Sequence, residues 1–192
     1  MKLLGYKIRK RDEQKARALV FLLRLLVLSI PLYIVIVSGV SLHPLQVSTA
    51  AQSEAVLEGM GFSVMRQGAY MEAQRLGPGP FQFLISEDST AWKSLLFLAA
   101  LIIAVPGVSW NKRLWGIVPG LIVIWLVNIG RVVAIVLAEE AYGTETAILV
   151  HDWLWRLGLV LAVLAIWLAW LFWAKRKRKR GLAKFVGQLR KR

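Results

Sequence analysis

The amino-acid sequence predicts an all-α integral membrane protein with about four transmembrane helices and a small extracytoplasmic cap. Of the 192 residues, 57% are hydrophobic, and the mean hydropathy is +0.57. Soluble domains of this length are less apolar. The apolar residues gather in stretches at residues 18–40, 92–108, 114–138 and 153–174. Each stretch has roughly the 17–25 residues that a helix needs to cross ~30 Å of hydrocarbon.

The basic residues predict how these stretches are oriented. Of the 25 Lys and Arg residues, 19 lie in a leader (1–17), a short turn (110–113) and a tail (175–192). Four spans place these segments on one side, so the positive-inside rule predicts that both termini are cytoplasmic. We therefore expect a multi-pass protein of the cell membrane, with a membrane domain at 18–174 whose extracytoplasmic cap covers 41–91.

The first apolar stretch contains Pro31, which is expected to bend or end its helix. Its length and a weak small-residue cleavage site indicate a retained helix and not a cleaved signal peptide. In the third stretch, Gly116 and Gly120 have the small-xxx-small spacing that allows close approach of a neighbouring helix. The basic tail follows the last stretch directly, where such clusters bind anionic lipid, so nucleic acid is not an expected partner.

The cap segment shows local order. Residues 49–60 suit a short amphipathic helix, with Gly61 as its C-terminal stop. Residues 62–71 indicate a small hairpin, and a turn follows at 76–80. Residues 81–85 alternate like a strand and lead to Ser-Glu-Asp-Ser-Thr, which comes directly before the second apolar stretch. The cap is thus predicted to hold one short helix and two or three short strands.

Three polar residues are expected to meet at the outer face of this topology. Ser89 precedes the second span, His151 precedes the fourth, and Arg131 lies about seven residues below the outer end of the third, at ~10 Å depth. Asn128 lies one turn below Arg131 on the same helix face. A hydroxyl, a guanidinium and an imidazole together form a candidate nucleophilic site, and an arginine within a span is a functional hypothesis by default.

Other residues near this site have candidate roles. Glu87 and Asp88 stand at its entrance, where they would bind an acceptor amine or simply be solvated. Trp92 is expected to form a wall. Asp152 is adjacent to His151, but neighbours on a helix point in different directions, so no third member of a catalytic triad is obvious. There are no cysteines and two histidines, so neither a disulfide nor a multi-histidine metal site is expected, and no cofactor is implied.

Structural roles for the three residues stay open at this point. Ser89 alone would usually cap the N-terminus of the helix that follows. Arg131 would be a buried partner of Glu139 or Glu140, or would reach lipid phosphate. His151 alone would be an interfacial or helix-capping residue.

Four segments in order resemble the exosortase/archaeosortase family of membrane transpeptidases, over about residues 49–170. They are the helix-strand entry at 57–68, the nucleophile segment at 85–94, the Asn-x-x-Arg of 126–131 and the His of 150–152. The resemblance implies a catalytic Cys, Arg and His, which fall by position on Ser89, Arg131 and His151. It also implies cleavage of the C-terminal sorting signals of membrane-anchored precursors, each a motif, a transmembrane helix and a basic tail. An acyl-enzyme would then pass its acyl group to a membrane-anchored acceptor, a lipid or amine of unknown identity.

The chain departs from the family at two positions. Ser89 stands where the family has Cys, and Ala91 stands where it often has Gly. An inactivating Cys-to-Ser substitution and a native serine enzyme are both consistent with this sequence. The alternative class is a non-enzymatic polytopic membrane protein, such as a transporter subunit or assembly factor, with Arg131 lining a polar path. Transporters usually show more intramembrane polar groups and an internal repeat.

Overall fold

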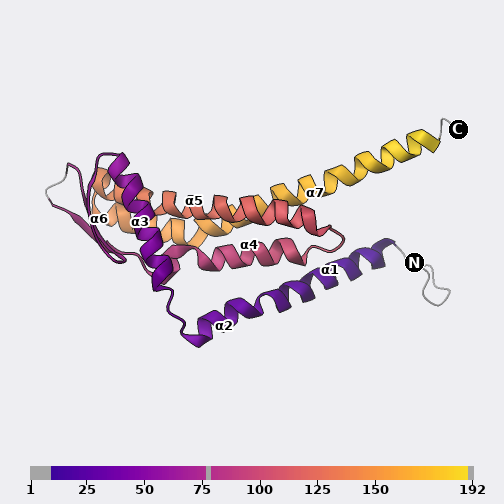
Figure 1. The fold of residues 1–192 in the computed structure, drawn as a ribbon, viewed down its shortest axis with the longest axis horizontal. Helices are drawn as coiled ribbons and strands as arrows, with labels where there is room; N and C mark the ends of the chain where they lie inside the picture. The colour runs from indigo at the N-terminus through magenta and orange to yellow at the C-terminus, as the bar shows by residue number, and fades with distance from the viewer. Residues whose placement is uncertain (1–9, 77–78, 190–192) are drawn as a thin grey trace.

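A computed structural model describes residues 10–76 and 79–189. Long helices form a bundle, and a small sheet with two further helices covers one of its ends, opposite to the start of α1 and the end of α7 (Figure 1). The helices are α1 (Lys10–Leu28), α2 (Ile30–Ser38), α3 (His43–Gly59), α4 (Trp92–Ala104), α5 (Trp110–Tyr142), α6 (Thr144–Trp153) and α7 (Leu159–Leu189). The strands are β1 (Ser63–Gln67), β2 (Tyr70–Gln74) and β3 (Phe81–Leu84).

Two helical units are long and apolar enough to cross a membrane, namely Asp12–Ser38, which joins α1 and α2, and α5. Two shorter apolar helices, α4 and Leu159–Lys175 of α7, lie beside α5 and contact each other. The mostly helical fold with a small sheet is therefore confirmed. The four-span topology stays a prediction.

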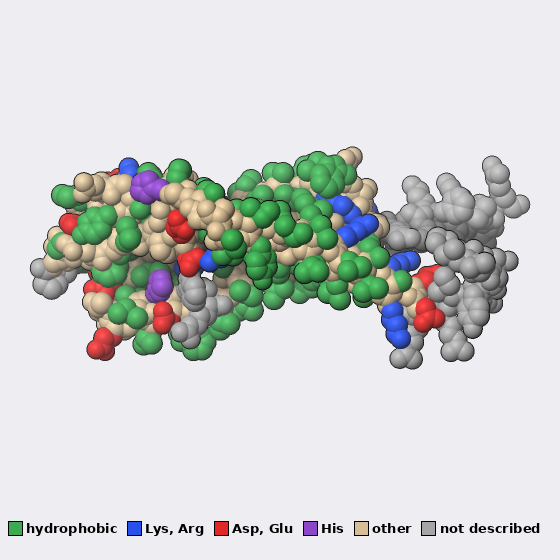
Figure 2. All heavy atoms as spheres, turned by 90° about the horizontal axis from the view of Figure 1, so that it is seen from below, with side chains coloured by type: hydrophobic (Ala, Val, Ile, Leu, Met, Phe, Trp, Pro, Cys, Tyr) green, Lys and Arg blue, Asp and Glu red, His purple; other side chains and the backbone are tan. Residues whose placement is uncertain are grey.

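The outer surface of the bundle is apolar along its middle. Figure 2 shows hydrophobic side chains over the centre of the molecule and charged side chains toward its two ends. Val37 is 81% exposed and Trp115 is 74% exposed. Contiguous apolar surface of this extent marks contact with another apolar phase, which is the arrangement that a membrane protein requires.

The ends of several helices differ from the prediction. Helix α5 starts at Trp110, so the expected turn at 110–113 is its first turn, and it continues to Tyr142. Pro119 lies inside α5 without ending it, as membrane helices tolerate. The expected fourth span at 153–174 is helical, but it is not one α-helix: α6 ends at Trp153, and a π-helical turn (Leu154–Gly158) precedes α7. Gly143, with φ of 82°, separates α5 from α6.

The cap has the expected elements. Helix α3 begins six residues before the predicted start because Pro44 occupies its first turn, where no backbone N–H is needed. It ends as expected near Gly61, whose φ is 89°. The Gly61 N–H donates to Glu58 O at 2.9 Å and the Phe62 N–H to Leu57 O at 3.0 Å, the Schellman pattern of a helix end. The three strands form an antiparallel sheet in the order β1-β2-β3.

Two hydrophobic cores hold these parts together. One joins α3 and the sheet to the C-terminal half of α5, and the other lies among α4, α5 and α7. The glycine spacing in α5 serves close packing, because a Cβ on Gly116 would lie 2.3 Å from the Trp170 indole nitrogen. That nitrogen donates to Lys112 O at 2.9 Å.

Parts of the prediction concern residues outside the described part of the chain. The turn at 76–80 includes residues 77 and 78, and the basic leader and tail include residues 1–9 and 190–192.

Candidate active site

The three residues singled out in the sequence line one pocket at the cap end of the bundle. The pocket has a volume of about 270 Å³. Its walls come from β3 and the residues after it, from α5 and from α6; they are Phe81, Phe83, Leu84, Ile85, Ser89, Arg131, Val132, Ile135, Ala147, Ile148 and His151. The fold thus brings together side chains from three separate segments, in surroundings that are otherwise apolar.

Ser89 lies in a 3₁₀ turn (Glu87–Thr90) between β3 and α4. Its side chain is 9% exposed, and its Oγ lies 3.0 Å from Ser86 Oγ. The role of helix N-cap is wrong for Ser89, because Ala91 occupies that position of α4. The hydroxyl therefore remains available to the pocket.

Ala91 has an unusual backbone conformation. Its φ is 59°, the left-handed region, and no other non-glycine residue in the described part of the chain has a positive φ. An L-residue with a Cβ is disfavoured there by roughly 1–2 kcal/mol. This geometry gives a physical reason for a glycine at this position, two residues after the nucleophile position.

Arg131 is buried, with 5% of its surface exposed. Its Nε and Nη1 atoms have no hydrogen-bond partner among the described residues. Glu140 forms an ion pair with Arg75 at 2.7 Å, and Glu139 accepts a hydrogen bond from Thr144 Oγ1 at 3.0 Å, while its Oε2 has no partner among the described residues. No ion pair joins Arg131 to either glutamate in the described part of the chain, so the role of Arg131 as their partner is wrong. Buried polar groups are nearly always bonded, so an unpaired guanidinium beside a pocket indicates a site for an electron-rich ligand.

Asn128 connects α5 to the nucleophile turn. It is fully buried, and its Nδ2 donates to the backbone oxygen of Ser89 at 2.8 Å. Its Oδ1 is buried and has no partner within the described residues. Asn128 and Arg131 lie one turn apart on α5, so the same helix face holds the turn and supplies the cation.

His151 reaches the pocket from α6. Its side chain is 45% exposed, and its Nδ1 lies 3.3 Å from Asp152 Oδ1. The expectation that these neighbours point apart is wrong, because both lie in the last turn of α6 with exposed side chains that are free to converge. Within the described part of the chain, Ser89 Oγ bonds Ser86 and no hydrogen bond joins it to His151. Such bonds are often long or absent before substrate binds.

The acidic residues of the nucleophile turn face away from the pocket. Glu87 accepts a hydrogen bond from the backbone N–H of Leu42 at 3.3 Å, and Asp88 pairs with Lys93 at 2.5 Å. They share a separate recess with Trp92 and part of α2. The expectation that Trp92 forms a wall of the pocket that holds Ser89 is therefore wrong.

Some lining residues were missed in the sequence. Ala147 and Ile148 of α6 carried no motif, because α6 itself was not predicted. Phe81 and Phe83, whose stacked rings lie 5.2 Å apart, had a visible signal in the alternation of the strand. Among the described residues, no group of three or more His, Asp or Glu side chains is placed to hold a metal ion.

The fold and the pocket together define a helical membrane protein in which Ser89, Arg131 and His151 gather under a cap at one end of the bundle. A family model described as transmembrane exosortase matches residues 10–173. The chain therefore belongs to the exosortase family, which confirms the resemblance seen in the sequence and gives it a general role in membrane transpeptidation or protein sorting. No curated protein and no solved structure matches the chain.

Proposed function

We propose that the chain is a membrane-embedded protease or transpeptidase of a cysteine-type class, with Ser89 in place of the cysteine, that cleaves C-terminal sorting signals of exported, membrane-anchored precursors. The observation that carries the proposal is the unpaired, buried guanidinium of Arg131 in the same pocket as Ser89 and His151. A nucleophile, a proton acceptor and a fixed cation are the groups that acyl transfer needs.

Each group has a defined task in the proposed reaction. Ser89 Oγ attacks the scissile carbonyl carbon, and its proton passes to His151 Nε2, because Nδ1 faces Asp152. The guanidinium of Arg131 donates hydrogen bonds to the developing oxyanion in a site with little water. His151 then returns the proton to the leaving amine as the C–N bond breaks. A lipid-anchored acceptor or water releases the acyl group.

The serine determines how fast this reaction runs. A thiol has pKa ≈ 8.5 and readily becomes a thiolate beside cationic groups. A serine hydroxyl needs an oriented base at the moment of attack. The contact between His151 and Asp152 supports such orientation, and we expect the Ser89 chain to be slow compared with a Ser89→Cys variant. An inactivated variant of a cysteine enzyme and a native serine enzyme both fit these contacts.

The proposed membrane position puts the site on the extracytoplasmic face of the cell membrane. Counted from Leu114, about 20 residues of α5 cross the hydrocarbon and end near Val133, so Arg131 would lie at the outer boundary. At the other end of the bundle, Arg17, Lys112 and Lys175 line a cavity of about 450 Å³. Basic pockets between cytoplasmic helix ends bind anionic headgroups, which supports both the orientation and an anionic lipid partner beside the basic tail.

A transporter subunit or assembly factor would need polar groups that continue through the bundle. In the described residues, the buried side chains that follow Asn128 toward the opposite end are apolar and include Ile124, Leu98 and Ile102. This packing does not favour a polar path past Arg131.

The test uses a reporter, defined as an exported protein that ends in a candidate sorting signal from the same genome. It is co-expressed with the Ser89 chain and with Ser89→Cys and Ser89→Ala, and cleavage is followed by mass. We expect cleavage by the Cys form, slower or absent cleavage by the Ser form, and loss in Ser89→Cys chains that also carry Arg131→Ala or His151→Ala. Arg66→Ala, on the cap surface in an ion pair with Glu54, is the matched control and should cleave normally. Failure of the Cys form on every signal of that genome would refute the proposal.

A further inference from the structure

Strand β3 is the edge of the sheet that borders the pocket. It pairs with β2 on one side, and among the described residues no strand pairs with its other side. The Ile85 N–H donates to Ala69 O at 3.0 Å, which sets the phase of the ladder. Backbone groups of alternate residues therefore point to β2 from Phe81 and Phe83, and to the free side from Gln82 and Leu84.

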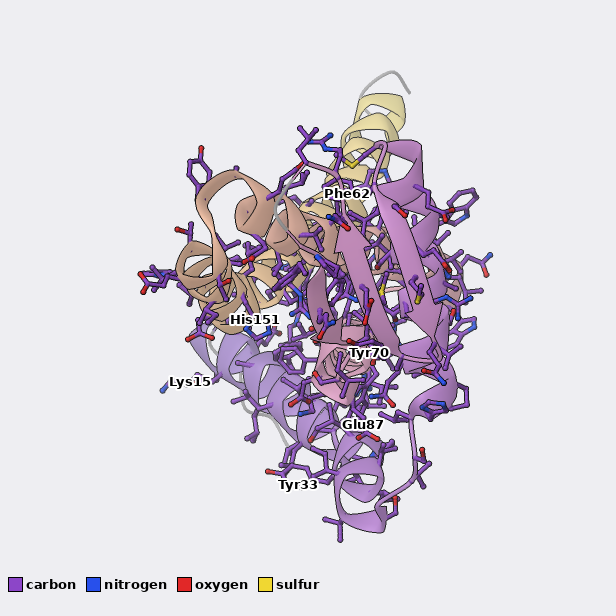
Figure 3. The ribbon with its side chains drawn as sticks, turned by 90° about the vertical axis from the view of Figure 1, so that its left-hand side faces the viewer. Lys15, Tyr33, Phe62, Tyr70, Glu87 and His151 are labelled. Carbon is purple, nitrogen blue, oxygen red and sulfur yellow. The ribbon has the colours of Figure 1, made fainter. Side chains whose placement is uncertain are left out.

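A groove runs along this free edge. Phe81, Phe83 and Leu84 of β3 line one side of the pocket, and Ile148 and His151 of α6 line the other. Figure 3 shows His151 between the helices and the sheet, facing the space that separates them. The residues of α5 form the floor. An open strand edge and an apolar floor match an extended peptide better than a helix or a small polar ligand.

We infer that the sorting-signal segment before the scissile bond binds as an added strand on the free edge of β3. The inference rests on the proposed function and names its mode of recognition. Exposed sheet edges are usually protected by charges, Pro or bulges, whereas this strand reads Phe-Gln-Phe-Leu without a charge. The backbone groups of Gln82 and Leu84 supply the main-chain hydrogen bonds, and alternate substrate side chains enter the pocket.

The direction of the added strand follows from the connections of β3. The strand runs toward the bundle, because Leu84 leads through the turn of Ser89 into α4. In the proposed substrate, the transmembrane helix follows the cleaved bond, so its chain also runs toward the membrane. The two strands are therefore parallel. Phe81, Phe83, Ile135 and Ile148 face the substrate, so the side chain that enters between them is apolar.

Proline at position 84 tests the edge directly. Leu84→Pro removes an N–H that points away from β2, and edge strands tolerate proline in that orientation. Leu84→Ala is the matched control, because it shortens the side chain and keeps the N–H. In the Ser89→Cys chain, we expect Leu84→Pro to lower kcat/KM for the reporter about tenfold, the loss of roughly one hydrogen bond. Leu84→Ala also shortens a side chain that lines the pocket, so the tenfold loss is measured relative to Leu84→Ala.

A second measurement does not depend on turnover. The chain has no cysteine, so Gln82→Cys in the Ser89→Ala chain forms disulfides only with reporters that carry one Cys at successive positions. A parallel added strand predicts cross-links at every second position, and moving the Cys from 82 to 84 shifts the pattern toward the cleaved bond. A shift in the opposite direction, or cross-links without alternation, would overturn the inference.

The outcomes separate the two proposals. If the Ser89→Cys chain cleaves the reporter and Leu84→Pro cleaves it as fast as Leu84→Ala, strand addition is wrong and the proposed function stands. If no form cleaves any reporter, the proposed function fails and strand addition fails with it. Thermal unfolding of Leu84→Pro is measured in parallel, and the cross-links decide the matter if this variant does not fold.

Discussion

Replacing Arg131 by Met should make the protein more stable while it abolishes cleavage. Arg131 is 5% exposed, and two of its nitrogens have no hydrogen-bond partner among the described residues. A buried charge without a hydrogen-bond partner opposes folding. Met has a similar length and fills the same volume without polar atoms.

The size of the gain follows from the two unpaired nitrogens. A buried donor without a partner costs about 1–3 kcal/mol, so two cost roughly 2–6 kcal/mol at most. The packing contacts that the guanidinium loses lower this figure. We expect a net gain of about 1–3 kcal/mol, in the range measured when buried ionic groups are replaced by apolar ones. For a chain of this size, that corresponds to a rise in Tm of roughly 2–10 °C.

The assay is thermal unfolding of the purified protein in lipid nanodiscs, followed by the fluorescence of its nine Trp residues. Arg75→Met is the matched control, because Arg75 is paired with Glu140 through two hydrogen bonds, at 2.8 and 2.7 Å. This control should lower Tm, since it leaves a carboxylate without its partner. If Arg131→Met lowers Tm by as much as the control, the guanidinium of Arg131 stabilises the fold and the prediction is refuted.

Three further predictions concern the cap and the bundle. Ala91→Gly should raise the free energy of unfolding by about 1 kcal/mol, because it relieves a positive φ; chemical denaturation in detergent measures it, and a loss would contradict the strain. Gly116→Ala should lower the free energy of unfolding by about 1–3 kcal/mol, because the new Cβ overpacks against the indole of Trp170. A Cβ on Gly130 meets no atom within 4 Å, so Gly130→Ala should not destabilise the protein in the same denaturation assay. Glu72→Gln should lower the pKa of Tyr70, which the hydrogen bond to Glu72 raises. The bond contributes to the free energy of unfolding below the pKa of Tyr70 in the unfolded chain, about 10, and this contribution is lost as pH rises through the pKa in the folded chain. Titration of tyrosinate absorbance measures the shift, and an unchanged curve would count against the prediction.

The sequence predicted local structure best where a residue type or spacing is typical of one backbone conformation. Gly61 marks the end of α3 because an αL residue closes a helix, and the alternation at 81–85 predicts a strand because one face is buried. The joint placement of Ser89, Arg131 and His151 followed from membrane depth alone. The roles assigned to them stay predictions.

The parts that were missed depend on contacts between distant segments. Helix α6 is too short and too polar to be a span, so its residues were expected to form a loop. Its first residues, Thr-Glu-Thr-Ala, are nevertheless compatible with a helix that starts after Gly143. The meeting of His151 with Asp152 depends on rotamers that sequence spacing does not specify. The pairing of Glu140 with Arg75 also depends on tertiary contacts, and it removes one of the two glutamates of α5 as a partner for Arg131.

The origin of the pocket walls in three separate segments has a consequence for biogenesis. Membrane helices enter the bilayer in order as the ribosome supplies them, and here one wall, α6, is made after α5. A nascent chain that has released only the first five helices holds Ser89 and Arg131 but has no histidine beside them. In the proposed reaction, such a chain would lack its proton acceptor until synthesis has passed residue 151.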